Sequence, residues 1–368
     1  MSFGVRITMD TDSRKSARRW WAKFLVANIA GIAVWTLVDF FYTTGGGRGD
    51  YPPIAGETLD RPAPSSWITR FREGVCFTAL DENGYNNAYY RDFQRDLSDV
   101  DVLVLGSSHV EAFQVSPRSN FVYLLNERFA EGDAKLSFYN SGRSAHVFVI
   151  RGARYEEALK LFKPKEIAVF EMFHFPSKES VDYALAGKIQ NKRDAAVPSF
   201  MRWAPSRRVA LFWRKLTKRG EESEPNPFEG VGKNTAAPSE APSEELKECW
   251  GDWLRRIREL SDRHGVKAIV YFHKNATLGK DGSYIPPYCE EEMAAFRELC
   301  EREGIVFVDA TERFREAYEK NNVWAYGFSN AGVVSGHMNR DGHRMLADVL
   351  EETIRKMETE SKENERNQ

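Results

Sequence analysis

A serine that follows an apolar strand and a distant histidine are the residues of this chain best suited to chemistry. The apolar run 102–105 is followed directly by Gly106, Ser107 and Ser108, and His337 comes some 230 residues later. A serine hydroxyl on a strand-to-helix turn becomes a nucleophile when a histidine takes its proton. The pair Ser108 and His337 therefore predicts the chemistry of a serine hydrolase or acyltransferase.

Two histidines near the C-terminus could serve as the base. His337 precedes an amphipathic stretch, whereas His343 falls one turn into the predicted helix 342–357, where packing or capping is the commoner role. A histidine near its solution pKa can accept the serine proton and return it to the leaving group. We therefore assign the base to His337.

Five apolar runs alternate with amphipathic segments after residue 100. The predicted strands are 101–105, 135–139, 167–173, 266–272 and 305–309, and the predicted helices are 121–129, 151–161, 246–264, 290–303 and 342–357. This alternation predicts a doubly wound, parallel five-stranded α/β sheet in three layers, as in flavodoxin-like folds. Ligands bind such sheets at the carboxyl ends of the strands. Ser108, the loop 140–146, His174 and Asp309 all follow predicted strands there.

Four segments of the chain resemble, in order, the sequence blocks of the SGNH (GDSL-type) hydrolases and acyltransferases, over roughly residues 85–355. Segment 106–111 resembles the block that carries the nucleophile, and segment 140–145 resembles the block that helps to form the oxyanion hole. Segment 167–174 takes the place of the third block, and segment 337–347 is similar to the histidine block. The resemblance implies the three-layer α/β fold of SGNH hydrolases, with Ser108 as nucleophile, His337 as base, and Asn140, Gly142 and Ala145 at the oxyanion or substrate site.

The chain departs from the family pattern in its first three blocks. Ser107 stands where the family has an aspartate, and Ala145 stands in place of a glycine, although its backbone N–H can still serve an oxyanion hole. The third block lacks the usual asparagine and ends in His174, which either donates to the oxyanion instead or is structural.

The histidine block lacks the acid that normally orients the base. Val334 occupies the position of the family's aspartate, three residues before His337. Another acid, with Asp309 as the first candidate, or a backbone carbonyl must then orient the ring, or nothing does. Loss of the orienting acid lowers turnover by up to ~10⁴ in well-studied triads.

An apolar run near the N-terminus predicts a membrane anchor. Residues 24–42 carry one charge, at Asp39, and have about the length that crosses ~30 Å of hydrocarbon. The run is long for a cleaved signal peptide, and residues 43–47 make a poor cleavage site. The basic residues before the run are Arg6, Arg14, Lys15, Arg18, Arg19 and Lys23. The positive-inside rule therefore predicts a single-pass anchor in the cell membrane, with residues 1–23 cytoplasmic and the remainder extracytoplasmic.

Composition shifts divide the rest of the chain. We expect a Gly- and Pro-rich spacer at 43–66, an SGNH-like domain at 67–357 and a charged tail at 358–368. The domain carries an insertion at 176–245, in which 220–245 is of low complexity and expected to be partly disordered. The basic and aromatic stretch 176–217 predicts a partly buried amphipathic helix; a lid or a surface for anionic lipid or polymer is the alternative.

Composition also excludes some classes of function. A net charge of −2 gives no reason to expect nucleic acid, and the four cysteines lack metal-ligand spacing and are expected as free thiols. We predict a serine esterase or O-acyltransferase, without cofactor or metal, acting on acyl (above all acetyl) esters of a cell-envelope polysaccharide or glycan. The alternative is a non-catalytic SGNH-like module that binds a glycan or a partner in an envelope-assembly complex.

Overall fold

The computed structural model describes most of the chain in two compact units. The described residues are 11–38, 66–71, 74–81, 83–87, 99–130, 135–144, 146–187, 189, 241–288, 290–328 and 332–366. One unit comprises residues 1–45 and 193–222, and the other comprises 46–192 and 223–368. Helix α1 (Thr11–Val38) belongs to the first unit, and all other described elements belong to the second.

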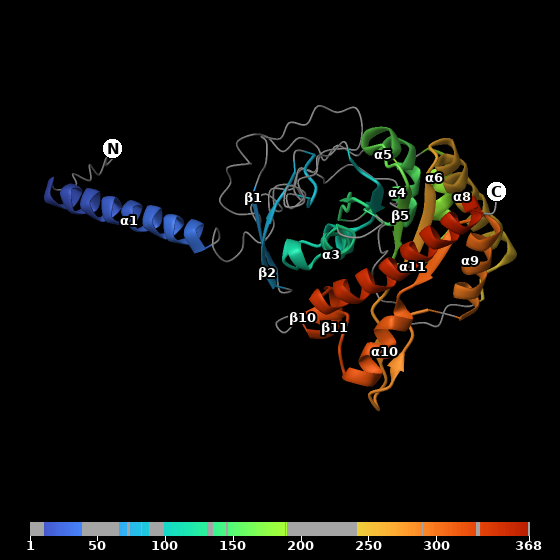
Figure 1. Cartoon of the computed structure of the whole chain (residues 1–368). Helices are drawn as coiled ribbons and strands as arrows, with labels where there is room; N and C mark the ends of the chain where they lie inside the picture. Colours follow the sequence, from blue (N-terminus) through green and yellow to red (C-terminus); the bar gives the residue numbers. More distant parts are fainter. Residues whose placement is uncertain are drawn as a thin grey trace, which may run out of the picture. The chain divides into compact units, whose positions relative to one another are not determined.

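A parallel five-stranded sheet forms the centre of the second unit (Figure 1). Its order is β4-β3-β5-β6-β9, with all neighbouring strands parallel. The strands are β3 (Val102–Leu105), β4 (Phe138–Asn140), β5 (Ile167–Met172), β6 (Lys267–Phe272) and β9 (Val306–Asp309). The predicted parallel sheet is thus confirmed, and the chain reverses its winding direction between β3 and β5, where doubly wound folds place their ligands.

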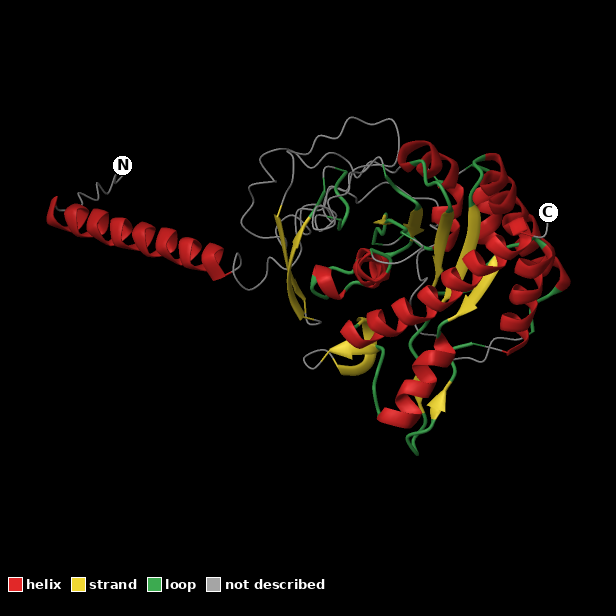
Figure 2. Cartoon of the chain, in the orientation of Figure 1, coloured by secondary structure: helices red, strands yellow, loops and turns green. Residues whose placement is uncertain are grey.

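Helices cover both faces of the sheet, which makes three layers (Figure 2). Leu103 and Leu105 of β3 point into one hydrophobic core, and Val102 and Val104 point into the other. The first core is covered by α4 (Phe148–Ala153), α5 (Tyr155–Phe162), α6 (Lys178–Leu185), α8 (Glu244–Arg263) and α9 (Glu290–Arg302), and the second by α3 (Phe121–Arg128), α10 (Thr311–Asn321) and α11 (Arg340–Arg366). Because both faces are buried, the strands are mostly continuous apolar runs rather than alternating sequences.

Several elements lie where the sequence pattern predicts none. They are the hairpin of β1 (Ser66–Phe71) and β2 (Gly74–Ala79), the short helices α2 (Ser108–Glu111) and η3 (Pro117–Ser119), helix α10, the small pair β7 (Thr277–Leu278) and β8 (Tyr284–Ile285), and the antiparallel pair β10 (Tyr326–Phe328) and β11 (Gly332–Met338). Most of them are too short to show a clear hydrophobic period. The predicted helix 151–161 is two helices that meet at Arg154, and α11 continues through most of the predicted charged tail.

Parts of the predicted organisation fall outside the described residues. These parts are the spacer up to residue 65 and residues 190–240 of the insertion, whereas α6 and the start of α8 occupy the two ends of that insertion. The cysteines at 76, 249 and 300 are buried and form no disulfide with one another, and Cys289 is not among the described residues.

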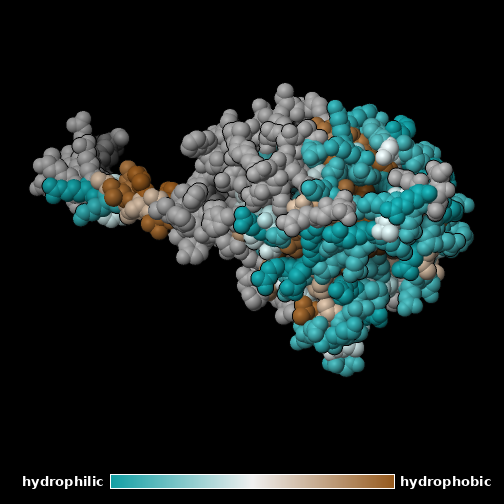
Figure 3. Space-filling model, viewed as in Figure 1, coloured by the Kyte–Doolittle hydropathy of each residue, from teal (hydrophilic) through white to brown (hydrophobic). Residues whose placement is uncertain are grey.

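Helix α1 exposes large apolar side chains between residues 20 and 34 (Figure 3). The exposed residues are Trp20, Trp21, Phe24, Leu25, Val26, Ile29, Ile32 and Val34. Among the described residues, no helix combines the length and the apolar character needed to cross a bilayer. The predicted anchor continues through residues 39–42, which lie beyond the described part of α1.

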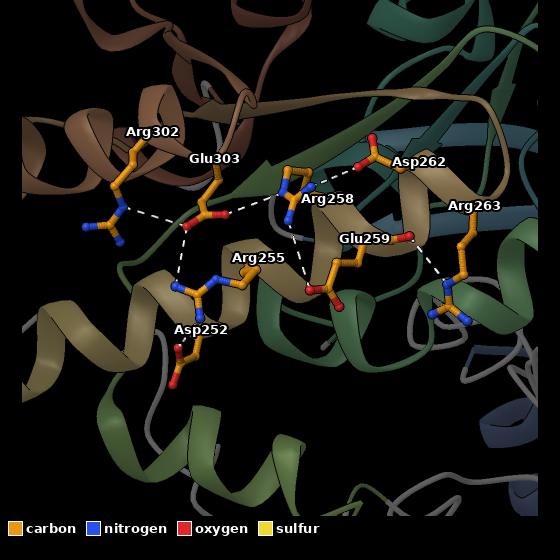
Figure 4. A network of polar contacts seen from close by, with 8 residues as sticks. All are labelled: Asp252, Arg255, Arg258, Glu259, Asp262, Arg263, Arg302 and Glu303. Carbon is orange, nitrogen blue, oxygen red and sulfur yellow. Dashed lines mark hydrogen bonds and ion pairs between the residues drawn. The ribbon is translucent and has the colours of Figure 1, made fainter.

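An ion cluster around Glu303 joins the end of α9 to α8 (Figure 4). Glu303 Oε1 lies 3.6 Å from both Arg255 Nη2 and Arg302 Nε, and Oε2 lies 3.5 Å from Arg258 Nε. The Glu303 side chain is only 8% exposed, but each arginine is more than a third exposed. Solvent screening therefore limits what the cluster contributes to stability.

Glu303→Gln is expected to lower the free energy of unfolding by about 1 kcal/mol, because three arginines lose their shared carboxylate. Urea denaturation at low salt measures this loss, and it should shrink at 1 M NaCl, where the Debye length is ~3 Å. Glu259→Gln changes a neighbouring side chain that is 57% exposed and serves as the control. An equal loss at both salt concentrations would contradict an electrostatic role for Glu303.

Candidate active site

A sharp turn after β3 presents Ser108 at the carboxyl end of the sheet. Gly106 begins this turn and has no room for a side chain, because a Cβ would lie 2.3 Å from Glu171 Oε2. Ser107 caps α2, since its Oγ accepts a hydrogen bond of 3.4 Å from the N–H of His109. Ser108 is the first residue of α2, so its side chain is fixed at the edge of the sheet.

The structure brings Ser108 and His337 together. His337 Nε2 lies 2.9 Å from Ser108 Oγ, and both side chains are half-buried. The sequence predicts His337 in a loop before the last helix, but the structure places it on strand β11. At this distance an imidazole with an unprotonated Nε2 can accept the hydroxyl proton. The chosen nucleophile and base therefore have the geometry for proton transfer.

The competing histidine, His343, is buried in α11 and has a structural environment. Its Nδ1 accepts a hydrogen bond of 3.4 Å from the N–H of Phe121, and the two rings stack at 5.9 Å. Burial lowers the pKa of His343 to about 3, so the ring is neutral. His343 thus joins α11 to α3, as expected of a packing or capping residue.

The structure does not bring Asp309 to His337, which corrects our first candidate for the orienting acid. Asp309 Oδ1 accepts hydrogen bonds from the N–H of Thr311 at 2.9 Å and from its Oγ1 at 2.5 Å. This carboxylate, on the last residue of β9, therefore binds the first residue of α10, and its hydrogen bonds within the described chain go to Thr311. The backbone of Val334 lies on β11, but its side chain is not among those described.

The second loop is fastened to α2 through Asn140 and Gly142, whose assignment to the oxyanion or substrate site stays a prediction. Asn140 Nδ2 donates to the carbonyl of Val110 at 2.6 Å, and its Oδ1 accepts from the N–H of Gly142 at 2.7 Å. Both groups are thus used inside the protein, where they hold the loop in place. Ala145 lies outside the described residues.

Ser108, after β3, and His174, after β5, each carry a nitrogen without a partner among the described residues. The N–H of Ser108 is the first of α2 and has no acceptor among the described residues, as is usual at a helix start. His174 Nε2 is buried and has no partner within the described structure, and its ring lies 4.7 Å from that of Phe173. Burial, helped by the nearby Lys274, lowers the pKa of His174 to about 4, so its imidazole is neutral with one N–H to donate.

Sequence analysis missed a buried polar network beside the nucleophile turn. The Glu171 carboxylate, on β5 and 2% exposed, accepts from the N–H of Ser107 and, at 2.8 Å, from its Oγ. Glu171 Oε1 also lies 2.9 Å from His273 Nε2, and His273 Nδ1 lies 2.5 Å from the Tyr326 hydroxyl. An ionised carboxylate only accepts, so His273 donates to it through Nε2, and in the neutral ring Nδ1 accepts from the Tyr326 hydroxyl. The available signal was a glutamate within an otherwise apolar strand.

A buried arginine joins the nucleophile turn to the second loop. Arg151 on α4 donates from Nε to the carbonyl of Gly106 at 2.9 Å and from Nη2 to the carbonyl of Ser141. Burial lowers the pKa of Arg151 to about 10, which still leaves the guanidinium charged at neutral pH. In the same loop, the N–H of Ser144 donates to the Glu111 carboxylate at 3.0 Å, so the loop is attached to α2 as well.

Within the described part of the chain, no cluster of three or more His, Cys, Asp or Glu side chains is arranged to hold a metal ion.

No protein-family model and no curated protein matches the sequence.

Solved structures of several hydrolases are similar to this chain. Esterase EstA from Pseudoalteromonas sp. is 12% identical, with 70% of this chain and 98% of that chain covered and a TM-score of 0.39. The acetyl xylan esterase AlAXEase is also 12% identical, with coverages of 69% and 99% and a TM-score of 0.40. A GDSL-like lipase from Bacteroides thetaiotaomicron is 10% identical, with coverages of 74% and 97% and a TM-score of 0.34. At such values none of these likenesses identifies a substrate for this chain.

Glu171→Gln is expected to slow the reaction of Ser108 with a fluorophosphonate by about 10-fold or more, because small displacements of a reacting group are costly. The amide cannot accept from both Ser107 groups and from His273 at once. Asp309→Asn is the matched control, since it also changes a carboxylate at a strand end. Asn Oδ1 can still accept both hydrogen bonds from Thr311, so this variant should change stability little and leave the labelling rate unchanged. Equal slowing in both folded variants would contradict the roles given to the two acids.

Proposed function

We propose that this protein is a serine hydrolase of the SGNH type, in which Ser108 and His337 cleave or transfer an acyl ester. The observation that carries the proposal is the distance of 2.9 Å between His337 Nε2 and Ser108 Oγ. A serine hydroxyl is a weak nucleophile until a base takes its proton, and histidine is the usual base at neutral pH. A module that only binds a glycan has no need of this pair.

The first half of the reaction forms an acyl-enzyme. Ser108 Oγ attacks the ester carbonyl carbon while His337 Nε2 takes the hydroxyl proton, and the carbonyl oxygen becomes an oxyanion. The N–H of Ser108 and the imidazole N–H of His174 donate to this oxyanion. When the tetrahedral intermediate collapses, the bond to the leaving alcohol breaks and His337 returns the proton to the alcohol oxygen.

The second half decides between an esterase and an acyltransferase. Water attacks the acyl-enzyme in an esterase, and a sugar hydroxyl attacks it in an O-acyltransferase. In both cases His337 takes the proton of the attacking group and returns it to Ser108 Oγ. We propose that the substrate is an acyl ester, above all an acetyl ester, of a cell-envelope polysaccharide or glycan.

We also propose that the N-terminal segment attaches the protein to the cell membrane and leaves the domain extracytoplasmic. The support is the series of exposed apolar side chains on α1, including Phe24, Ile29 and Ile32, together with the basic residues that precede them. Exposed apolar groups in such a helix lower their free energy by entering lipid. Membrane attachment would place the site next to envelope polymers.

Ser108→Ala and His337→Ala are each expected to reduce turnover of p-nitrophenyl acetate by about 10⁴-fold, because neither half of the pair works alone. Ser108→Ala should also abolish labelling by a fluorophosphonate. His343→Ala is the control: it removes a buried ring, so it should lower the urea midpoint but retain turnover per folded molecule. Labelling that persists in Ser108→Ala, or equal loss of turnover in both folded histidine variants, would refute the assignment. Absence of labelling in the wild type would favour the binding module.

Ile29→Lys combined with Ile32→Lys is expected to release a large part of the full chain from bacterial membranes. A lysine near the centre of an apolar helix costs about 2.5–3.5 kcal/mol on insertion. The measurement is the fraction in the pellet after an alkaline carbonate wash. Ile285→Lys changes an exposed isoleucine outside α1 and should leave that fraction unchanged. Equal distribution of all variants in the supernatant would rule out the anchor.

A further inference from the structure

The residues that follow the nucleophile and the base are hydrogen-bonded to each other. His109 follows Ser108, Met338 follows His337, and the N–H of Met338 donates to His109 Nδ1 at 3.3 Å. Both residues are buried. This bond therefore connects helix α2 to strand β11 immediately beside the pair Ser108 and His337.

The ring of His109 is also packed against the ring of the base. The centroids of His109 and His337 are 5.1 Å apart, and the two planes are inclined by 46°. On its other sides His109 stacks on Phe173 at 4.7 Å and meets His273 edge-on at 4.9 Å and Tyr326 at 5.8 Å. Contacts on several sides leave the imidazole little freedom to rotate.

We propose that His109 is a positioning residue: its neutral imidazole holds β11 against α2 so that His337 Nε2 stays at the Ser108 hydroxyl. The proposal rests on the proposed function, because positioning matters only if Ser108 and His337 react.

The protonation of His109 agrees with this role. Nδ1 can accept from Met338 only when it carries no proton, which requires the neutral tautomer with its proton on Nε2. Burial, followed by the neighbouring His273 and His337, holds the pKa of His109 well below its ordinary value. The bond to Met338 is therefore maintained at neutral pH.

Two substitutions separate the hydrogen bond from the packing. His109→Phe keeps a flat ring against His337 but has no acceptor for the N–H of Met338. His109→Asn places an Oδ1 acceptor close to the position of Nδ1 but loses most of the ring and leaves a cavity. His109→Asn should therefore be the less stable variant, and His109→Phe the one without the bond.

If the bond positions the base, kcat for p-nitrophenyl acetate should fall by about 10- to 100-fold in His109→Phe with little change in KM. His109→Asn should retain more of the wild-type kcat although it unfolds at lower urea. A role in packing alone predicts the reverse order, with activity following stability. That reverse order would overturn the proposal.

Amide hydrogen exchange of Met338 in the full chain gives a readout that needs no activity. Exchange should be slow in the wild type and in His109→Asn and faster in His109→Phe. Unchanged exchange in His109→Phe would overturn the proposal even if the wild-type protein is an active esterase. If the wild type shows the expected exchange pattern but hydrolyses no ester, the proposed function fails and the bond stands as a structural one.

Discussion

The site depends on one buried carboxylate. Glu171 lies within the sheet, where an ionised group without partners would be very costly, and the hydrogen bonds from Ser107 and His273 offset that cost. To supply those bonds, the turn after β3 must lie close to β5. The turn can approach so closely because Gly106 has no side chain in the space that Glu171 fills. The position of Ser108 thus depends on the hydrogen bonds that the preceding Ser107 donates to Glu171 on the neighbouring strand β5.

The parallel sheet brings these groups together from distant parts of the chain. Ser108 follows β3, Glu171 is near the end of β5, and His273 follows β6, so the carboxyl ends of three neighbouring strands converge. The base comes from a different place, the pair β10 and β11, whose Tyr326 meets His273. An unbroken set of polar contacts therefore runs from Ser107 to Tyr326, the residue that opposes Met338 in that pair. It links the segment of the nucleophile to the segment of the base.

The sequence predicts the sheet well because strands buried on both faces are continuous apolar runs bounded by polar turns. It also selects Ser108 and His337, because a serine after a strand and a histidine before a helix are local patterns. It does not reveal that Glu171, His273 and Tyr326 meet, because their contacts depend on which strands are neighbours. Asp309 was chosen for its place at the end of β9, but Thr311, two residues further on, donates two hydrogen bonds to its carboxylate. The pair β10 and β11 was missed because short strands that pair with each other show no long period.

The two-stranded ribbon of β10 and β11 is a sheet of its own, separate from the sheet that carries Ser108. The imidazoles of two residues outside the ribbon form hydrogen bonds with it. His273 bonds to the Tyr326 hydroxyl, and His109 bonds to the N–H of Met338. Tyr326 and Met338 of the ribbon are also buried in the second hydrophobic core, where the Tyr326 ring packs against Phe314 of α10. Movement of the ribbon away from Ser108 therefore also uncovers apolar surface of that core, so separation of the serine from its base and loosening of the core are coupled in this molecule.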